Sequence, residues 1–277
     1  HVAMVLQTLG RTPLWIGFVG GDTGKDLVSG LEGLGIRVHA CPTRQRTRVN
    51  LEIIEDDRRV TEILEPGGTP SQLEVTEFHK KCESAFAQGR EQLMVIFSGS
   101  LPPGLEDGFY ASLIARANSF GCRTFLDTSG EPLRLALAAS PHFVKPNRQE
   151  AESLLGCSIS DLSAGARALQ QMISLGARSA AISMGTQGLL SCAGKGEPVH
   201  HAPAIALKPR STVGCGDAAV AAFAHAAALG LGVEETLRLA TACAAANCLA
   251  ESPGEARLAD IQSFRNQAST KVFMSAG

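Results

Sequence analysis

The stretch Ser211–Phe223 reads STVGCGDAAVAAF, in which a Gly-x-Gly turn, Gly214 to Gly216, leads into an alanine-rich helix. Backbone N–H groups at such a turn, together with the positive end of the helix, form a cradle for anionic oxygen atoms. Asp217 stands at the start of this helix. An aspartate there is either a simple helix cap or a carboxylate placed for chemistry beside a bound anion. The segment therefore predicts an anion site at a helix terminus.

Short apolar runs of β type alternate with helical patterns along most of the 277 residues. Such alternation is typical of βαβ units around a parallel sheet with helices on both faces. We therefore predict a single α/β domain over residues 1–277, with a doubly wound, mainly parallel sheet. The expected strands are residues 14–19, 93–97, 124–126, 143–144 and 180–183. The last part of the chain, from Asp217 onward, is predicted to be helical.

Residues 36–66 break this alternation, because three β-type runs follow one another without a helix between them. The runs are residues 36–40, 49–54 and 60–64, and the last two are expected to form a hairpin with its turn at residues 55–58. We predict that this segment is a small antiparallel β lid inserted in the main domain. An edge extension of the main sheet is the alternative.

The composition excludes several classes of protein. Hydrophobic residues make up 44% of the chain, and no apolar run approaches the roughly 20 residues that span a membrane. The formal net charge of -2 gives no global field that would attract nucleic acid. The eight cysteines contain no C-x-x-C pair, so we expect reduced thiols and a cytoplasmic protein. A local basic cluster suited to a small anion consists of Arg44, Arg46, Arg48, Arg58 and Arg59.

Three further motifs follow predicted strands, which is where open α/β sheets bind ligands. The first is S-G-S-L-P-P-G at residues 98–104, the second is K-P-N-R-Q-E at residues 145–150, and the third is I-S-M-G-T-Q-G at residues 182–188. Each also has a local explanation. The first is a turn, the second a capping box between Asn147 and Glu150, and the third a hairpin turn.

The four motifs together resemble those of the PfkB or ribokinase family of carbohydrate kinases. The likeness is carried by G-C-G-D at residues 214–217, where Cys215 stands in place of the usual alanine, and by S-G-S-L-P-P-G, which is typical of the phosphosugar branch. T-R-V-N-L at residues 47–51 is similar to the T-R-x-N-[LI] stretch of that branch. The resemblance implies a ribokinase-like fold in which ATP, with Mg²⁺, phosphorylates a small sugar phosphate.

The resemblance also implies roles for particular residues. Asp217 would be the catalytic base, and the backbone of Gly214, Cys215 and Gly216 would bind the transferring phosphoryl group. Glu150 would help to organise Mg²⁺, often through water. The residues expected to hold the sugar phosphate are Arg48, Ser98 and Ser100. The residues expected beside ATP are Lys145, Asn147, Ser183, Gly185, Gly188 and Asn247.

The predicted function is ATP-dependent phosphorylation of a ketohexose phosphate, with fructose 1-phosphate ahead of tagatose 6-phosphate and fructose 6-phosphate. A ligand-binding relative without activity is an alternative, because the family's amino-terminal strand and G-G-K-G-x-N loop precede the segment that begins at His1. A Rossmann dehydrogenase is disfavoured, since the G-x-G-x-x-G spacing is absent, and no Walker loop is present. The expected partners are ATP, the sugar phosphate and a second copy paired through the lid, with no nucleic acid or membrane.

Overall fold

The computed structural model describes residues 1–55, 60–89 and 92–275. Its largest sheet has seven strands in the order β11-β10-β9-β8-β7-β6-β5. Strands β5 to β8 pair in parallel, whereas β8 to β11 pair antiparallel. The predicted doubly wound, mainly parallel α/β sheet is confirmed, with an antiparallel edge. The strands are β5 Met94–Ser98, β6 Arg123–Asp127, β7 Phe143–Val144, β8 Ala180–Ser183, β9 Leu189–Cys192, β10 Val199–Ala202 and β11 Lys271–Met274.

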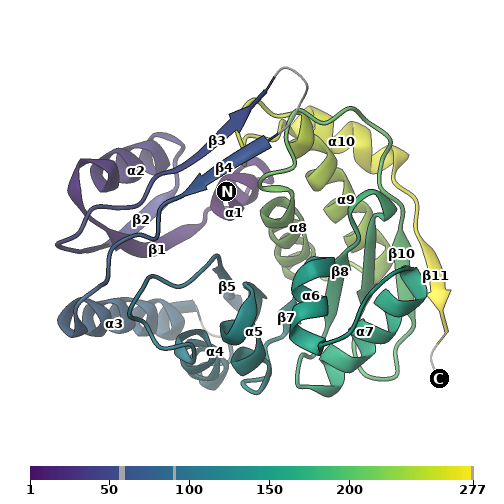
Figure 1. Cartoon of the computed structure of the whole chain (residues 1–277), viewed down its shortest axis with the longest axis horizontal. Coiled ribbons are helices and arrows are strands. Elements are labelled where there is room, and N and C mark those ends of the chain that lie inside the picture. Colours follow the sequence, from purple (N-terminus) through teal and green to yellow (C-terminus); the bar gives the residue numbers. More distant parts are fainter. Residues whose placement is uncertain (56–59, 90–91, 276–277) are drawn as a thin grey trace.

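Helices cover both faces of this sheet (Figure 1). Because side chains alternate along a strand, neighbouring residues serve two separate cores. Leu126 and Val144 pack in the first core, and Phe125 and Phe143 pack in the second. No helix in the described part of the chain is both long and apolar enough to cross a membrane. The helices that pack in the first core are α3 Gln72–Gly89, α4 Phe109–Ser119, α5 Gly130–Leu137, α6 Arg148–Leu155 and α7 Leu162–Ser174. Those that pack in the second core are α1 Val2–Thr8, α8 Cys215–Leu229, α9 Val233–Leu249 and α10 Leu258–Gln267.

A separate two-stranded parallel sheet joins β1 (Leu14–Val19) to β2 (Arg37–Pro42). Helix α2 (Gly21–Gly33) lies between the two strands in the chain, and α3 packs against both of them. Residues 36–40 were predicted to belong to the lid, and this prediction is wrong, because β2 pairs with β1. The reason is that the helix before β2 gives the chain the length it needs to return in the same direction, so the strand pairs in parallel with β1.

The lid consists of β3 (Asn50–Ile54) and β4 (Val60–Leu64), which pair antiparallel as a sheet of their own. The predicted hairpin is confirmed, and it is not an extension of the main sheet. Its predicted turn, residues 55–58, lies in part outside the described residues. The Glu52 carboxylate accepts a hydrogen bond from the Ser211 hydroxyl, so the lid contacts the loop that precedes α8.

Helix α8 is the element that positions the predicted anion site. Most of its residues are small and buried, so it packs closely between the sheet and α9. Phe223 stacks on Phe143 of β7 with ring centroids 4.3 Å apart, which fixes the helix on the sheet. Gly214 directly precedes the helix and has a φ of 76°, a left-handed conformation that favours glycine. Gly214 thus sets the start of α8, and Phe223 anchors the helix on the sheet.

Candidate active site

A cavity of about 950 Å³ lies at the carboxyl ends of four parallel strands. Ser98 ends β5, Asp127 ends β6, Lys145 directly follows β7 and Ser183 ends β8, and all four residues line the cavity. The amino-terminal end of α8 lines it as well, through Asp217. This is the edge at which open α/β sheets bind their ligands. Motifs that are far apart in the sequence therefore meet in one place.

Most of the residues predicted for the site line this cavity. Arg48 does not, but its guanidinium Nη2 donates a hydrogen bond to the Oγ atom of Ser100 at 2.8 Å, so the strand-flanking arginine reaches the rim. The predicted residues that line the cavity are Ser98, Ser100, Lys145, Asn147, Glu150, Ser183, Gly185, Gly188, Gly214, Cys215, Gly216 and Asp217.

Asn247 lies behind the cavity and not in its wall. The side chain is only 3% exposed. Its Nδ2 atom donates to the carbonyl oxygen of Val213 at 2.8 Å, and its Oδ1 atom accepts from the backbone N–H of Gly254 at 2.7 Å. The amide thus holds the turn in front of α8, and its place near the nucleotide stays a prediction. A buried amide with both ends paired acts as a brace for the backbone.

The Asp217 carboxylate is held at both oxygen atoms. The hydroxyl of Ser98 donates to Oδ1 at 2.9 Å, and Nδ1 of His1 lies 3.0 Å from Oδ2. Burial is the largest single influence on its pKa and would raise it. The hydrogen bonds from His1 and Ser98 and the charges of His1 and Lys145 act the other way, and the pKa of Asp217 is lowered overall. The Asp217 carboxylate is therefore ionised at neutral pH, and its two hydrogen bonds fix its orientation.

Lys145 and Asp127 form a buried ion pair beneath the start of α8. The Nζ atom of Lys145 lies 3.4 Å from Oδ1 of Asp127, and the two side chains are 2% and 15% exposed. A Cβ atom added at Gly216 would lie 3.3 Å from this Nζ atom. Because Gly216 has no side chain, the Lys145 ammonium group and the backbone of α8 lie close to the same point in the cavity. An anion at that point would contact both of them.

Asp127 is a charged residue of the cavity that no sequence motif predicted. Its strand was predicted to end at Leu126, and a single aspartate after a strand carries no motif. Burial raises the pKa of Asp127 to about 6; Lys145 counteracts this effect, and the negative charges of Asp217 and Glu150 add to it. The signal that could have found it is its position after a parallel strand, next to the other strand-end loops.

The capping box predicted between Asn147 and Glu150 is present at the start of α6. The backbone N–H of Asn147 donates to Oε2 of Glu150 at 2.8 Å, and the backbone N–H of Glu150 donates to Oδ1 of Asn147 at 2.9 Å. Glu150 also lines the cavity. The local explanation and the functional one are therefore compatible, because the cap fixes a carboxylate at the edge of the site.

The loop between β8 and β9 is a tight turn, as its glycines predict. Gly185 and Gly188 have φ values of 59° and 94°. A Cβ atom at Gly188 would lie 2.0 Å from the carbonyl oxygen of Ala202, so only glycine fits there. Ser183 at the start of the turn lines the cavity together with both glycines.

The fold and the site together define a class of protein. One cavity at the edge of the α/β sheet brings three features together. They are a glycine turn at the amino terminus of a helix, an ionised carboxylate at the third position of that helix and a buried lysine. In enzymes that transfer phosphoryl groups, backbone N–H groups and lysines stabilise the charge of the transferring group, and a carboxylate accepts the proton of the acceptor. These features are those of an α/β phosphotransferase.

Comparison with known proteins identifies the family. Residues 2–259 match the pfkB family of carbohydrate kinases, and the chain belongs to this family. It is similar to the 1-phosphofructokinase of Rhodobacter capsulatus, with 35% identity over 244 residues that cover 87% of this chain and 76% of the relative. The 1-phosphofructokinase of Xanthomonas campestris is 37% identical over 245 residues, which cover 86% and 74%. The protein is a kinase that uses an alcohol group as phosphoryl acceptor.

Solved structures show the same relationship. The crystal structure of phosphofructokinase-2 from Escherichia coli in complex with potassium superposes with a TM-score of 0.88. The two sequences are 29% identical, and the match covers 96% of this chain and 85% of the other. The predicted ribokinase-like, PfkB-type assignment is thus confirmed by both sequence and structure.

We predict that the raised pKa of Asp127 makes stability fall as the pH rises from about 4 to about 6. The folded protein keeps the Asp127 proton up to about pH 6, whereas the unfolded chain loses it near 3.8, so folding loses free energy in this interval. Relative to Asp127→Asn, the free energy of unfolding of the wild type should drop by up to about 3 kcal/mol. Urea denaturation of both proteins at several pH values measures this. If the free energy of unfolding of the wild type minus that of Asp127→Asn is independent of pH, or rises with pH, the raised pKa is contradicted.

Proposed function

We propose that this kinase transfers the γ-phosphoryl group of ATP to a hydroxyl group of a ketohexose phosphate, and that fructose 1-phosphate is the preferred acceptor. One observation carries the proposal. Ser98 donates a hydrogen bond to Asp217 at 2.9 Å, and Ser100, two residues later in the same loop, accepts one from Arg48 at 2.8 Å. An acceptor seated on this loop would have its reacting hydroxyl at the carboxylate and its phosphate at the guanidinium, which suits phosphate oxygens.

In this proposal Asp217 accepts the proton of the acceptor hydroxyl. The lowered pKa of Asp217 keeps its carboxylate ionised at neutral pH, and the hydrogen bond from Ser98 sets its orientation. The hydroxyl oxygen forms a bond to the γ-phosphorus as the bond to the bridging oxygen breaks, and ADP leaves. The negative charge in transit is stabilised by the N–H groups around Gly216 and by the nearby Lys145 ammonium.

The order of the sugar preference rests on the relatives. The curated relatives from Rhodobacter capsulatus and Xanthomonas campestris are 1-phosphofructokinases. Tagatose 6-phosphate and fructose 6-phosphate come next, because each carries a phosphate that Arg48 could hold at a different distance from the reacting hydroxyl. The ATP phosphates are expected at the part of the cavity wall that follows β7 and β8. This part is formed by Asn147, Ser183, Gly185 and Gly188.

The carboxylates in the cavity suit Mg²⁺. Glu150 and Asp127 both line it, and carboxylate oxygens are the ligands that this ion prefers. Within the described ranges no group of three or more His, Cys, Asp or Glu side chains could hold a metal. This composition fits an ion that keeps several waters and also binds phosphate oxygens, which is the usual state of Mg²⁺ beside ATP. Bound there, it would supply positive charge to the phosphates.

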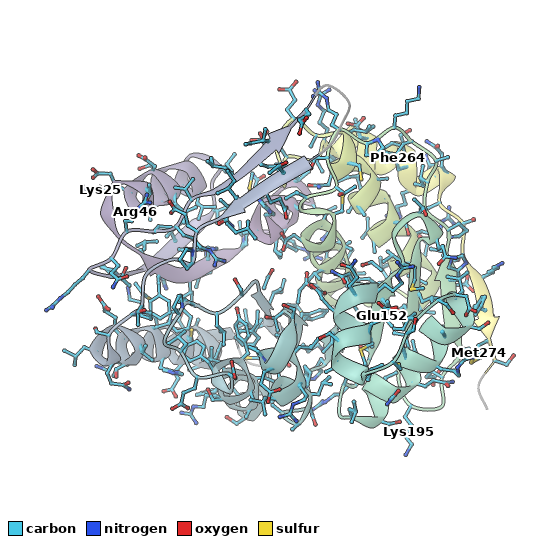
Figure 2. The ribbon with its side chains drawn as sticks, in the orientation of Figure 1. Lys25, Arg46, Glu152, Lys195, Phe264 and Met274 are labelled. Atoms are coloured by element: carbon cyan, nitrogen blue, oxygen red, sulfur yellow. The ribbon has the colours of Figure 1, made fainter. Side chains whose placement is uncertain are left out.

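The structure gives the dehydrogenase alternative no support. Gly20 and Gly21 follow β1, as the glycines of a dinucleotide loop would, but another part of the chain fills the space beside them. A Cβ atom at Gly20 would lie 2.0 Å from the carbonyl oxygen of Gln45, and one at Gly21 would lie 2.9 Å from Cβ of Arg46, which is labelled in Figure 2. These glycines therefore accommodate the segment that leads to the lid and not a pyrophosphate.

The proposal is tested by measuring ADP release from ATP with fructose 1-phosphate, tagatose 6-phosphate, fructose 6-phosphate and unphosphorylated fructose. We expect the highest kcat/KM for fructose 1-phosphate. Arg48→Ala should raise the KM for that sugar phosphate about tenfold to a hundredfold, because it loses a hydrogen bond between charged groups worth about 1.5–3 kcal/mol.

Arg46→Ala is the matched control, since it removes the same charge from the same segment but the guanidinium of Arg46 pairs with Glu65. Its KM should stay near that of the wild type. If the KM for fructose 1-phosphate rises equally in both variants, Arg48 supports the lid and does not bind phosphate. The same conclusion holds if Arg48→Ala raises the KM equally for fructose and for fructose 1-phosphate. ADP release with no sugar of the panel would favour a ligand-binding relative without activity.

We also propose that two copies of the chain pair through the lid. Leu51 lies opposite Ile63 in the β3–β4 register, and Ile53 follows on the same face. These three side chains are 54%, 50% and 48% exposed. Glu52, on the other face, bonds to Ser211 beside the site, so the apolar face points away from the cavity. Exposed apolar surface of this kind marks contact with another protein surface.

Sedimentation velocity tests the pairing. The wild type should sediment as a dimer, and Leu51→Glu should sediment as a monomer, because it places a charge in the apolar contact. Leu175→Glu is the control: Leu175 is 49% exposed but lies at the end of α7, so this variant should remain dimeric. A monomeric wild type, or equal effects of the two variants, contradicts a lid interface.

A further inference from the structure

Two cysteine side chains meet in the wall of the cavity. Cys215 is the first residue of α8, and Cys248 is the last residue but one of α9. Their sulfur atoms lie 3.1 Å apart, both thiols are free, and both residues line the cavity. The phosphoryl transfer proposed above uses the backbone at Cys215 and gives neither sulfur atom a task.

The distance between the sulfur atoms is close to that of a covalent bridge. A disulfide bond is about 2.05 Å long, so the atoms need to approach by only about 1 Å. Both cysteines stand near the end of a helix, where the backbone frays more readily than in the helix body. The cavity gives a small reagent access to both of them. The sulfur atoms are therefore close enough for a bridge between α8 and α9 to form after a small movement.

The two thiols differ in acidity, and this difference sets the order of reaction. The hydrogen bond between the two thiols is the largest influence on the pKa of Cys215 and lowers it, against the effect of burial. The Asn247 amide donates to the same sulfur atom at 3.5 Å. The amino terminus of α8 further stabilises a thiolate at Cys215. The same hydrogen bond raises the pKa of Cys248, and burial adds to this shift. The position of Cys215 at the start of α8 and the donor from Asn247 thus favour Cys215 as the nucleophile and Cys248 as the thiol that reacts second.

We propose that Cys215 and Cys248 form an oxidisable dithiol, which a small-molecule disulfide converts into an intrachain disulfide that slows phosphoryl transfer. The Cys215 thiolate attacks one sulfur of the reagent RSSR and releases RS⁻, which takes up a proton. Cys248 then gives up its proton, attacks the Cys215 sulfur of the mixed disulfide and releases the second RS⁻. The two cysteines lose two electrons and two protons, and the reagent leaves as two RSH molecules.

The bridge would act on the site through the turn in front of α8. Cys215 lies between Gly214 and Gly216 and two residues before Asp217. Asn247, next to Cys248, already holds the carbonyl oxygen of Val213 at 2.8 Å. Drawing Cys215 toward α9 therefore moves the N–H groups and the carboxylate together. Displacements of about 1 Å near reacting groups cost as much as a hundredfold in rate.

The part of this proposal that concerns rate rests on the kinase function proposed above, whereas the bridge itself does not. The test treats the whole chain with oxidised glutathione and follows two readouts, the tryptic peptides and ADP release before and after dithiothreitol. Trypsin cuts after Arg210, Arg238 and Arg257, so Cys215 and Cys248 fall in different peptides. Cys157→Ala is the control for an exposed cysteine, and Cys248→Ala removes the thiol that reacts second.

In the wild type and in Cys157→Ala we expect the two peptides to become linked with the loss of two hydrogen atoms. Turnover should fall roughly tenfold or more and return with dithiothreitol. In Cys248→Ala the reaction should stop at a glutathione adduct on Cys215. Cys243 lies in the same tryptic peptide as Cys248, so this result would also exclude Cys243 as the partner. Failure to link the peptides while Cys157 takes up glutathione overturns the proposed site.

Unchanged turnover in fully linked protein overturns the proposed effect on catalysis. Absence of turnover in the reduced protein contradicts the kinase proposal instead, and the peptide readout still decides whether the dithiol is oxidised as proposed.

Discussion

The hydrogen bond between Ser98 and Asp217 joins the end of β5 to the start of α8, and the other parts of the site are arranged around it. The second core holds α8 in place, with Phe223 stacked on Phe143. A largely buried carboxylate needs such donors, because an unpaired buried charge costs several kcal/mol. The same bond fixes the loop that carries Ser100, and Ser100 accepts a hydrogen bond from Arg48, which lies just before the lid.

The carboxylates in the cavity have different tasks because their surroundings differ. Hydrogen bonds lower the pKa of Asp217, whereas burial raises that of Asp127 to about 6 even though Lys145 is beside it. Glu150 is fixed by the backbone of α6. Carboxylates whose pKa values are moved apart in this way are a feature of sites that transfer protons. In the proposed mechanism Asp217 is the proton acceptor, and the other two carboxylates are charges near the phosphates.

The sequence was sufficient for what depends on local pattern. Alternating apolar runs predicted the strands and helices, and the motif at residues 98–104 was predicted to follow a strand end, which the structure bears out. The missed features depend on contacts between distant residues. Residues 37–40 pair with β1 and not with the lid, and Asn247 holds Val213, which lies 34 residues earlier in the chain. Asp127 has no motif, and only the folded sheet brings it to Lys145.

The central claim is that the Asp217 carboxylate accepts the proton of the acceptor hydroxyl. Its most direct test is the single-turnover rate of Asp217→Asn with ATP and fructose 1-phosphate, measured beside the ATP affinity and the far-ultraviolet circular dichroism of the same protein. The account predicts a wild-type spectrum, ATP binding close to that of the wild type and a chemical step slower by roughly 10²–10⁴-fold. A variant that binds ATP and turns over near the wild-type rate would contradict it.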